Sequence, residues 1–234
     1  MTTTIASPEP IAFTSYTLPA GPKLNIGSGP VQPDGWHNID GSNRAFLTAK
    51  LGWLDTGLTR AGVLAKSTFR DDTVYANLFK GLPYAANSAS CAYAGEVWEH
   101  FEYNDAAFLT RECFRVLKPG GVLRVCVPDG MQFWPKYIAL VEEQLAKPPN
   151  ARDAAAIRAH MKWCFDDICT RRNFTKSFGH YHKWQFDEVQ LFEMFEKAGF
   201  ALSQRMPFHQ SRIDDVARVE RSDFLIVEGI KPLK

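Results

Sequence analysis

A glycine turn and a carboxylate near the start of the chain have types and spacing that suit ligand binding. Gly27-Ser28-Gly29 directly follows the apolar stretch 24–26, and Asp40 ends a second apolar stretch. Glycine lets the backbone bend tightly and approach a ligand without a Cβ clash. A carboxylate at the end of the second strand can accept hydrogen bonds from both hydroxyls of a ribose. The pair indicates a site for an adenosine-type ligand; an ordinary tight turn and a solvated aspartate are the alternatives.

Several side chains further along the chain are suited to take a proton from a bound molecule. Histidine does this best near neutral pH. His180 and His182 lie in an aromatic stretch, and Asp129 directly follows an apolar, β-prone run. We take His182, His180 and Asp129 as candidate catalytic residues. The alternatives are packed histidines and a helix-capping aspartate, and for His100, next to Glu99, we expect a structural hydrogen-bonding role.

The residues after the glycine turn distinguish between two kinds of adenosine cofactor. A dinucleotide site needs Gly-x-Gly-x-x-Gly at the start of a helix, because the pyrophosphate rests on the helix N-terminus. Here Gly29 is followed by Pro30-Val31-Gln32-Pro33, with no third glycine and no good helix. The turn therefore favours a cofactor without phosphates.

Alternating strands and helices must position these residues. Apolar residues between 104 and 117 repeat at the spacing of one helical face, and Lys118-Pro119-Gly120-Gly121 is expected to end that helix. The alternation predicts a mainly parallel sheet with helices on both faces, and the last two strands, which have no helix between them, can pair antiparallel at its edge. The predicted strands are 24–26, 36–40, 73–78, 89–94, 122–127, 200–207 and 224–230, and the predicted core helices are 104–117 and 187–198.

A helical insertion interrupts this pattern after the fifth strand. Segments 135–146 and 151–169 have helical character and are separated by Pro148-Pro149. We expect the insertion, about 131–180, to act as a cap over the acceptor. The chain is therefore predicted to consist of a polar lead-in, 1–20, and one domain, 21–234, that includes the cap.

Composition restricts the classes of function. The chain has 27 basic and 26 acidic residues, so no overall field directs it to nucleic acid. No run of about 18 apolar residues is present to span a membrane, and no secretory signal is visible at the start. The five cysteines form no Cys-x-x-Cys pair, which predicts buried thiols in a reducing cytoplasm and no metal site made by cysteines.

Several motifs together resemble those of the class I S-adenosylmethionine-dependent methyltransferases, in particular the small methyltransferase type 11-like group. The matching segments, within residues 22–232, are 24–29, 36–40, 82–84, 97–101, 109–121, 125–129, 182–187 and 198–200. The Leu-Lys-Pro-Gly-Gly sequence at 117–121 is the most specific of them. The resemblance implies a Rossmann-like, seven-stranded sheet and S-adenosylmethionine as the cofactor.

The resemblance also implies roles for individual residues. The implied cofactor-binding residues are Gly27, Ser28, Gly29, Asp40, Asn77, Leu78, Gly95 and Glu96. The glycine turn would line the methionine and ribose parts, and Asp40 would hold the ribose hydroxyls. Asn77 and Leu78 would border the adenine. Gly95 and Glu96 would face the methionine end, where the methyl group is carried.

The predicted function is methyl transfer from S-adenosylmethionine to a small-molecule or glycan acceptor. Oxygen is the preferred acceptor atom, because an oxygen nucleophile of high pKa benefits from a general base whereas an amine needs only to be neutral. Two alternatives remain open at this stage: a degenerate methyltransferase-like domain that serves as a binding or scaffold protein, and an NAD-dependent sugar-nucleotide enzyme.

Overall fold

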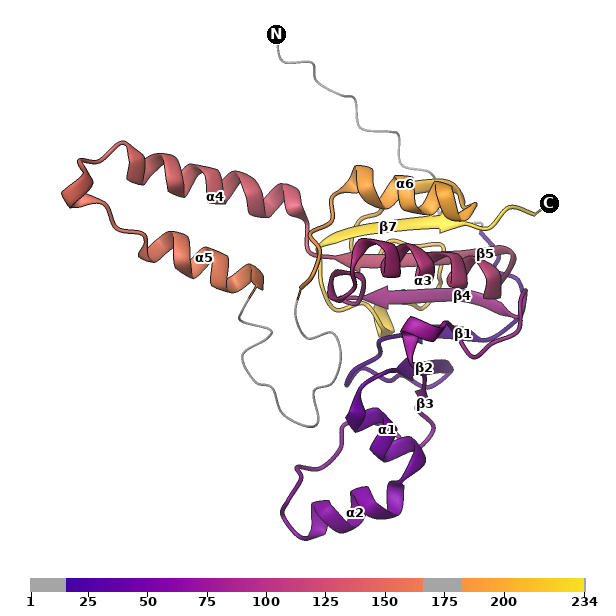
Figure 1. The fold of residues 1–234 in the computed structure, drawn as a ribbon. Helices are drawn as coiled ribbons and strands as arrows, with labels where there is room; N and C mark the ends of the chain where they lie inside the picture. Colours follow the sequence, from indigo (N-terminus) through magenta and orange to yellow (C-terminus); the bar gives the residue numbers. More distant parts are fainter. Residues whose placement is uncertain (1–15, 166–181, 234) are drawn as a thin grey trace.

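A seven-stranded sheet lies at the centre of the protein, in the order β3-β2-β1-β4-β5-β7-β6 (Figure 1). The computed structural model describes residues 16–165 and 182–233. The strands are β1 Lys23–Ile26, β2 Trp36–Asp40, β3 Val74–Tyr75, β4 Ala89–Gly95, β5 Leu117–Val127, β6 Ala201–Arg205 and β7 Leu225–Ile230. Neighbours among β1 to β5 are parallel, while β7 runs antiparallel to both β5 and β6. The predicted mainly parallel sheet with an antiparallel edge is confirmed.

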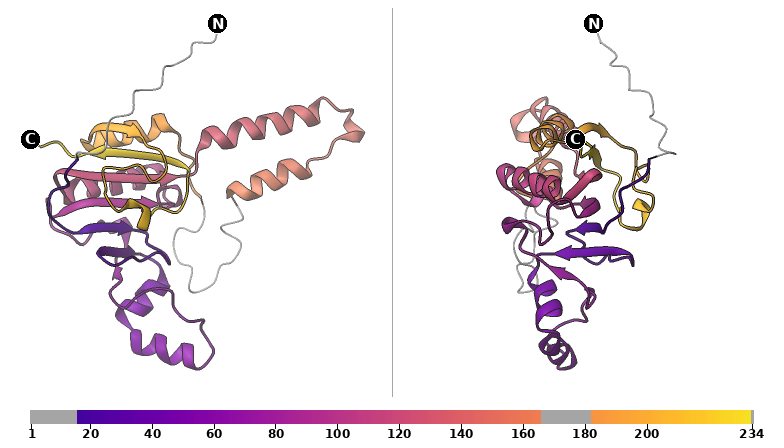
Figure 2. Two further views of the ribbon diagram at one scale, coloured as in Figure 1. Left: turned by 180° about the vertical axis from the view of Figure 1, so that it is seen from behind. Right: turned by 90° about the vertical axis from the view of Figure 1, so that its right-hand side faces the viewer.

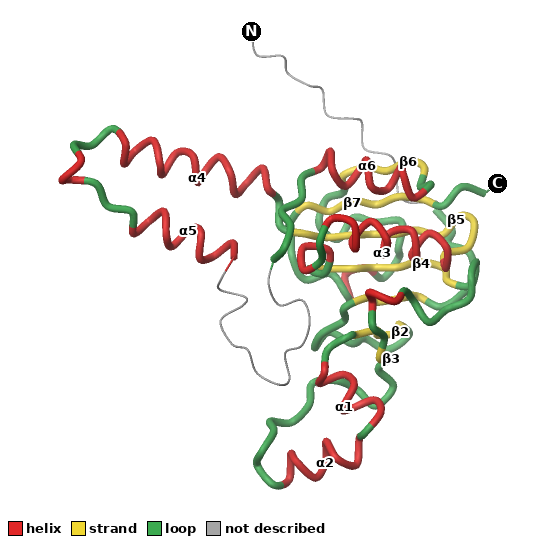
Figure 3. The backbone as a smooth tube through the Cα atoms, in the orientation of Figure 1, coloured by secondary structure: helices red, strands yellow, loops and turns green. Residues whose placement is uncertain are grey.

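The helices connect these strands (Figure 3). They are α1 Asn43–Lys50, α2 Gly52–Arg60, α3 Tyr103–Val116, α4 Gly130–Leu145, α5 Ala155–Phe165 and α6 Glu188–Ala198, with short 3₁₀ helices η2 Leu78–Lys80, η3 Trp98–His100, η4 Pro149–Ala151 and η5 Val216–Arg218. The predicted core helices are therefore present as α3 and α6. No described helix is long and apolar enough to cross a membrane.

Two predicted boundaries were wrong. The third strand, predicted over 73–78, is reduced to β3, and the chain turns into η2 at Leu78. The sequence 118–121, predicted as a turn, continues β5. The reason is pairing with the end of the chain: the N–H of Gly120 donates to the carbonyl of Lys231 at 2.8 Å, and the N–H of Lys231 donates to Gly121 at 2.9 Å. These bonds pair the glycine-rich segment with the end of the chain, and Gly120 adopts φ +76° within it.

Helices α3 and α6 cover one face of the sheet side by side (Figure 1). Leu109 and Cys113 of α3 and Phe195 of α6 are completely buried in a core shared with Val125 and Val227 of the sheet. The apolar spacing along α3 predicted this buried face. Burial of apolar side chains is the main free-energy gain that fixes both helices on the sheet.

The opposite face is covered by the connection 206–224 between β6 and β7 (Figure 2). Buried side chains of this connection, including Ile213 and Val219, pack against Tyr93 and Ile226 of the sheet. The predicted fold class is confirmed, but the cover of this face is a long connection with the single short helix η5. Residues 27–35 between β1 and β2 contain turns and no helix, so the connection covers this part of the sheet instead.

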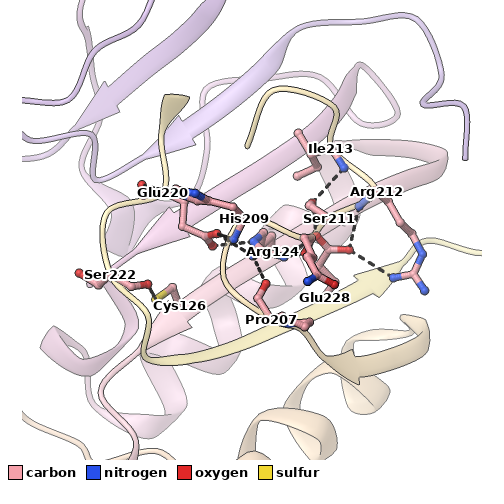
Figure 4. A network of polar contacts seen from close by, with 11 residues as sticks. Arg124, Cys126, Pro207, His209, Ser211, Arg212, Ile213, Glu220, Ser222 and Glu228 are labelled. Atoms are coloured by element: carbon pink, nitrogen blue, oxygen red, sulfur yellow. Dashed lines mark hydrogen bonds and ion pairs between the residues drawn. The ribbon is translucent and has the colours of Figure 1, made fainter. Parts of the chain in front are cut away.

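A buried charged network fixes the connection to the sheet (Figure 4). Arg124 of β5 donates from Nε and Nη2 to the two carboxylate oxygens of Glu220, at 2.7 and 2.8 Å, and from Nη1 to Glu228 of β7 at 2.9 Å. The carbonyls of Gln210 and Pro207 accept from Nη1 and Nη2 at 2.8 and 3.1 Å. Each guanidinium nitrogen therefore has a partner, although all three charged side chains are completely buried.

The connection supplies further partners to the same two carboxylates. Arg212 donates from Nη1 to Glu228 at 3.2 Å, and the hydroxyl of Ser211 also donates to Glu228. The backbone N–H of His209 donates to Glu220 at 2.6 Å. Two arginines balance two glutamates, so the network carries no net charge in the interior.

The predicted helical insertion is present as the pair α4 and α5. The two helices run side by side and extend away from the sheet beyond the end of β5 (Figures 1 and 2). His160 of α5 stacks on Phe133 of α4, with 4.4 Å between the ring centroids. The N–H of Gly130 donates to the carbonyl of Phe186 at 2.8 Å and closes the base of the insertion. Residues 166–180 of the predicted cap and 1–15 of the predicted lead-in lie outside the described residues.

Glu220→Ala should destabilise the protein by about 3–5 kcal/mol, because it leaves Arg124 buried without its bidentate partner. Urea denaturation followed by circular dichroism measures this change. Glu196→Ala, on the exposed side of α6, is the matched control and should change the free energy of unfolding by less than about 0.5 kcal/mol. Equal effects of the two substitutions would show that the network does not hold the connection in place.

Candidate active site

A cleft lies at the carboxyl ends of β1, β2 and β4. Strand order reverses between β1 and β4, and ligands of doubly wound sheets bind at such a point. The cleft encloses about 190 Å³ and is open to solvent. It is lined by Gly27, Asp40, Gly41, Ser42, Asn77, Leu78, Phe79, Glu96, Val97, His100 and Phe101.

The turn after β1 can only be made by glycine. Gly27 has φ +64°, and a Cβ on it would lie 2.4 Å from Cγ2 of Val97. A Cβ on Gly41, after β2, would lie 2.8 Å from the carbonyl oxygen of Ala76. A side chain at either position would clash with the cleft wall. These two glycines leave the space that a ligand needs between the strand ends.

Asp40 is held rigidly between the glycine turn and α1. One carboxylate oxygen accepts from the N–H of Gly29 at 3.1 Å, and the other accepts from the N–H of Ser42 at 2.8 Å. Ser42 in turn caps α1 by accepting from the N–H of Ala45. Asp40 is 8% exposed and still lines the cleft. Since a carboxylate oxygen can accept more than one hydrogen bond, both oxygens can also receive a ribose hydroxyl.

The far end of the cleft combines an amide with apolar side chains. The carboxamide oxygen of Asn77 accepts from the N–H of Phe79 at 3.1 Å and so caps η2. This bond leaves the amide N–H groups of Asn77 to serve a ligand. Leu78 is buried, and the ring of Phe79 lies 4.7 Å from the ring of Phe101. An apolar slot with an amide at its edge suits a planar heterocycle.

Most of the predicted cofactor-binding residues lie at this cleft. Those that line it are Gly27, Asp40, Asn77, Leu78 and Glu96. The other three, Ser28, Gly29 and Gly95, are beside it: Ser28 is completely buried behind the turn, Gly29 contacts Asp40, and Gly95 ends β4. No helix follows the turn within 27–35, so the anion cradle that a dinucleotide site requires is missing there.

Arg221 lies beside the cleft, at a position that the sequence did not reveal. Its guanidinium Nη2 donates to the carbonyl of Gly95 at 3.3 Å, and Nη1 lies 3.5 Å from the position that a Cβ of Gly29 would take. The neighbouring Ser222 donates its hydroxyl to the carboxylate of Glu96. The connection 206–224 therefore places an exposed cation at the ends of β1 and β4. No motif surrounds Arg221, so only the fold shows its position.

Glu99, His100 and His182 form a cluster next to the cleft. One donor atom from each lies within 4.8 Å of the others, and the rings of His100 and His182 are 5.0 Å apart. Glu99 is 1% exposed, and within the described part of the chain neither of its carboxylate oxygens has a hydrogen-bond partner. Burial raises the pKa of Glu99 to about 8. Without a cation beside it, the carboxyl is therefore largely protonated at neutral pH.

Main-chain hydrogen bonds bring His182 to this cluster. The N–H groups of Lys183 and Trp184 donate to the carbonyl of Glu99 at 2.7 and 3.2 Å. His182, predicted as catalytic, therefore lies beside His100, which lines the cleft. His100, for which we expected a structural role, is thus part of the site wall.

Asp129, also predicted as catalytic, does not line the cleft. Asp129 caps α4 by accepting from the N–H of Met131 at 2.9 Å, and it pairs with Arg205 at 3.1 Å. This is the capping alternative, and it arises because Asp129 stands between β5 and a helix. His180 lies outside the described residues.

Comparison with known proteins gives a match between part of this chain and one family model. Residues 57–125 match the family model Methyltransf_11, described as a methyltransferase domain. This segment runs from α2 into β5 and contains Glu96, Glu99 and His100. Over this segment the chain is similar to a methyltransferase domain. S-adenosylmethionine is the cofactor of such domains, and the carboxylate of Asp40, the slot at Asn77 and the glycine turn fit it.

One solved structure supports the fold. An S-adenosylmethionine-dependent methyltransferase from Methanosarcina mazei is 16% identical, with a TM-score of 0.51, over 94% of this chain and 96% of that one. A SAM-dependent methyltransferase from Thermotoga maritima is 17% identical, with a TM-score of 0.46, over 92% of this chain and 83% of that one. A Bordetella parapertussis protein is 16% identical with a TM-score of 0.49, and this chain covers only 63% of its length. Comparison with curated proteins gave no match.

Asp40→Ala should weaken binding of S-adenosylhomocysteine roughly tenfold or more, because charge-assisted hydrogen bonds to the ribose are lost. Isothermal titration calorimetry measures the affinity. Asp34→Ala is the control, since Asp34 is exposed and pairs with Arg70 on the surface. Unchanged affinity in the Asp40 variant would remove the ribose role from this residue.

Proposed function

We propose that the protein transfers the methyl group of S-adenosylmethionine to an oxygen atom of a small-molecule or glycan acceptor. When bound, the cofactor supplies a methyl group on a sulfonium sulfur, which keeps the electron pair of the broken bond and becomes a neutral thioether. The observation that supports the proposal is the position of Glu99, His100 and His182 next to the cofactor cleft. A net charge of +1 agrees with an acceptor other than nucleic acid.

On the cofactor side, residues of this chain bind and orient. Asp40 would hold the ribose hydroxyls, and the glycine turn would let the backbone approach the methionine part. Asn77 would contact the adenine edge. Arg221 would pair with the carboxylate of the methionine part, since it is the cation held at the ends of β1 and β4. Fixed contacts at both ends of the cofactor align its methyl group for an in-line displacement.

On the acceptor side, a hydroxyl must lose its proton as its oxygen bonds to the methyl carbon. His100 in the cleft wall and His182 beside it are placed to promote this step. Neutral amines need no such help, so the presence of this cluster supports oxygen over nitrogen. The exposed mouth of the cleft leaves room for an acceptor of small size.

Arg221→Ala should raise the dissociation constant of S-adenosylmethionine about tenfold, because one charge-assisted contact to its carboxylate is lost. Arg218→Ala is a matched control on the same connection, where Arg218 pairs only loosely with Asp215 at 3.9 Å. Calorimetry with both variants measures the difference. If both bind as the wild type does, Arg221 does not contact the cofactor.

His182→Ala should lower turnover by roughly 10²-fold while changing cofactor affinity little, because His182 lies on the acceptor side. The assay is release of S-adenosylhomocysteine in a screen of hydroxylated small molecules and sugars, combined with calorimetry. His37→Ala, an exposed histidine of β2, should leave turnover unchanged. Full turnover in the His182 variant on an accepted substrate would contradict the role. Absence of turnover by the wild type on every hydroxyl acceptor would count against the proposed reaction.

A further inference from the structure

We propose that Glu99, His100 and His182 form a binding site for one divalent first-row transition-metal ion, with Zn²⁺ as the best match. The site joins the wall of the cleft to the buried end of η3. Its role as an activator of the acceptor hydroxyl rests on the proposed function, whereas binding of the ion does not.

The donor geometry is close to that of a metal centre. One ligand atom from each of the three side chains lies within 4.8 Å of the other two. Zn–N and Zn–O distances of about 2.0–2.2 Å put the ligands of one tetrahedral ion roughly 3.4 Å apart. The donor atoms therefore need to approach one another by no more than about 1.4 Å to enclose an ion.

Glu99 is buried with no hydrogen-bond partner for its carboxyl group among the described residues. Its carboxylate is 1% exposed, and among the described residues no group donates a hydrogen bond to either oxygen. Burying an ionised carboxylate without a partner is strongly unfavourable. The ammonium of Lys183 lies over the ring of Phe79, 5.6 Å from the ring centroid, and donates no hydrogen bond to Glu99. A metal ion between Glu99 and the two histidines would coordinate the carboxylate of Glu99 and balance its negative charge.

The three ligands are preorganised by the main chain. Glu99 and His100 are adjacent in η3. His182 comes from a distant part of the sequence, but the next two residues both donate their N–H groups to the carbonyl of Glu99. The same carbonyl therefore fixes the segment that carries the third ligand. Rigid support of this kind around the ligands is what raises metal affinity in known sites.

The donor set selects the ion. Two imidazoles and one carboxylate match Zn²⁺, which is commonly held by His₂Glu sets with a fourth position left open. Mg²⁺ and Ca²⁺ prefer oxygen ligands and should bind far more weakly. Because His100 lines the cleft, the open position would face the acceptor. An acceptor hydroxyl bound there would release its proton to solvent at a lower pH.

The test is metal binding by the full chain after chelator treatment, without cofactor or acceptor. Calorimetry and equilibrium dialysis with Zn²⁺ should give one ion per chain, bound at least 100-fold more tightly than Mg²⁺. Glu99→Gln and His182→Ala should each weaken Zn²⁺ binding by about tenfold to 100-fold. Glu102→Gln and His37→Ala are controls outside the cluster and should bind Zn²⁺ like the wild type.

A second measurement distinguishes loss of metal binding from loss of folding in a variant. Co²⁺ in place of Zn²⁺ should give visible absorption bands of a four-coordinate site in the wild type, and Glu99→Gln should abolish them while S-adenosylhomocysteine still binds. No Zn²⁺ bound by the wild type, or the same Zn²⁺ affinity in Glu99→Gln and the wild type, would overturn the metal site. Zn²⁺ binding without cofactor binding would leave the metal site intact and contradict the proposed methyl transfer, so the two failures are distinguishable.

Discussion

The pairing of Arg124 with Glu220 and Glu228 is the interaction on which the site depends. Taking such charges out of water costs several kcal/mol for each, and this is offset only when every donor and acceptor finds a partner. The connection 206–224 supplies those partners through its backbone carbonyls, and it is thereby fixed on a face of the sheet that no helix between β1 and β2 covers. Its far end then carries Arg221 and Ser222 to the ends of β1 and β4. The charged network on one face of the sheet therefore fixes the connection that places Arg221 beside the cleft.

The parts of the fold that sequence reasoning predicted correctly, and the predicted residues that meet at the cleft, have local causes. β2 and β4 are short apolar strands whose ends are marked by a carboxylate and a glycine, and α3 shows its buried face in its spacing. Gly27 and Asp40 lie in one cleft because parallel neighbouring strands end at the same edge of the sheet. Each of these signals is contained within about ten residues, so one sequence is sufficient to recognise them.

The features that sequence reasoning missed depend on contacts between residues that are distant in the sequence. The segment 118–121 has the composition of a turn, yet pairing with Lys231 keeps it in β5. Arg221 has no neighbouring motif, and its place follows from a network whose partners, Arg124 and Glu220, are 96 residues apart. The sequence alone does not decide the role of His100 for the same reason. Its spatial neighbour His182 lies on the other side of the helical insertion in the sequence.

The two halves of the cleft therefore have different origins. The part that contains Gly27 and Asp40 is built from strand ends and the turns that directly follow them, so its geometry is fixed by the sheet itself. The part proposed to face the acceptor is built where η3 meets the segment 182–184, and the carbonyl of Glu99 is the point that joins them. A change in the length or path of the insertion α4–α5 would move His182 without moving Asp40 or Gly27. Since the two parts are supported separately, one of them can change in sequence while the other keeps its geometry, which is consistent with one fold that serves different functions through different sites.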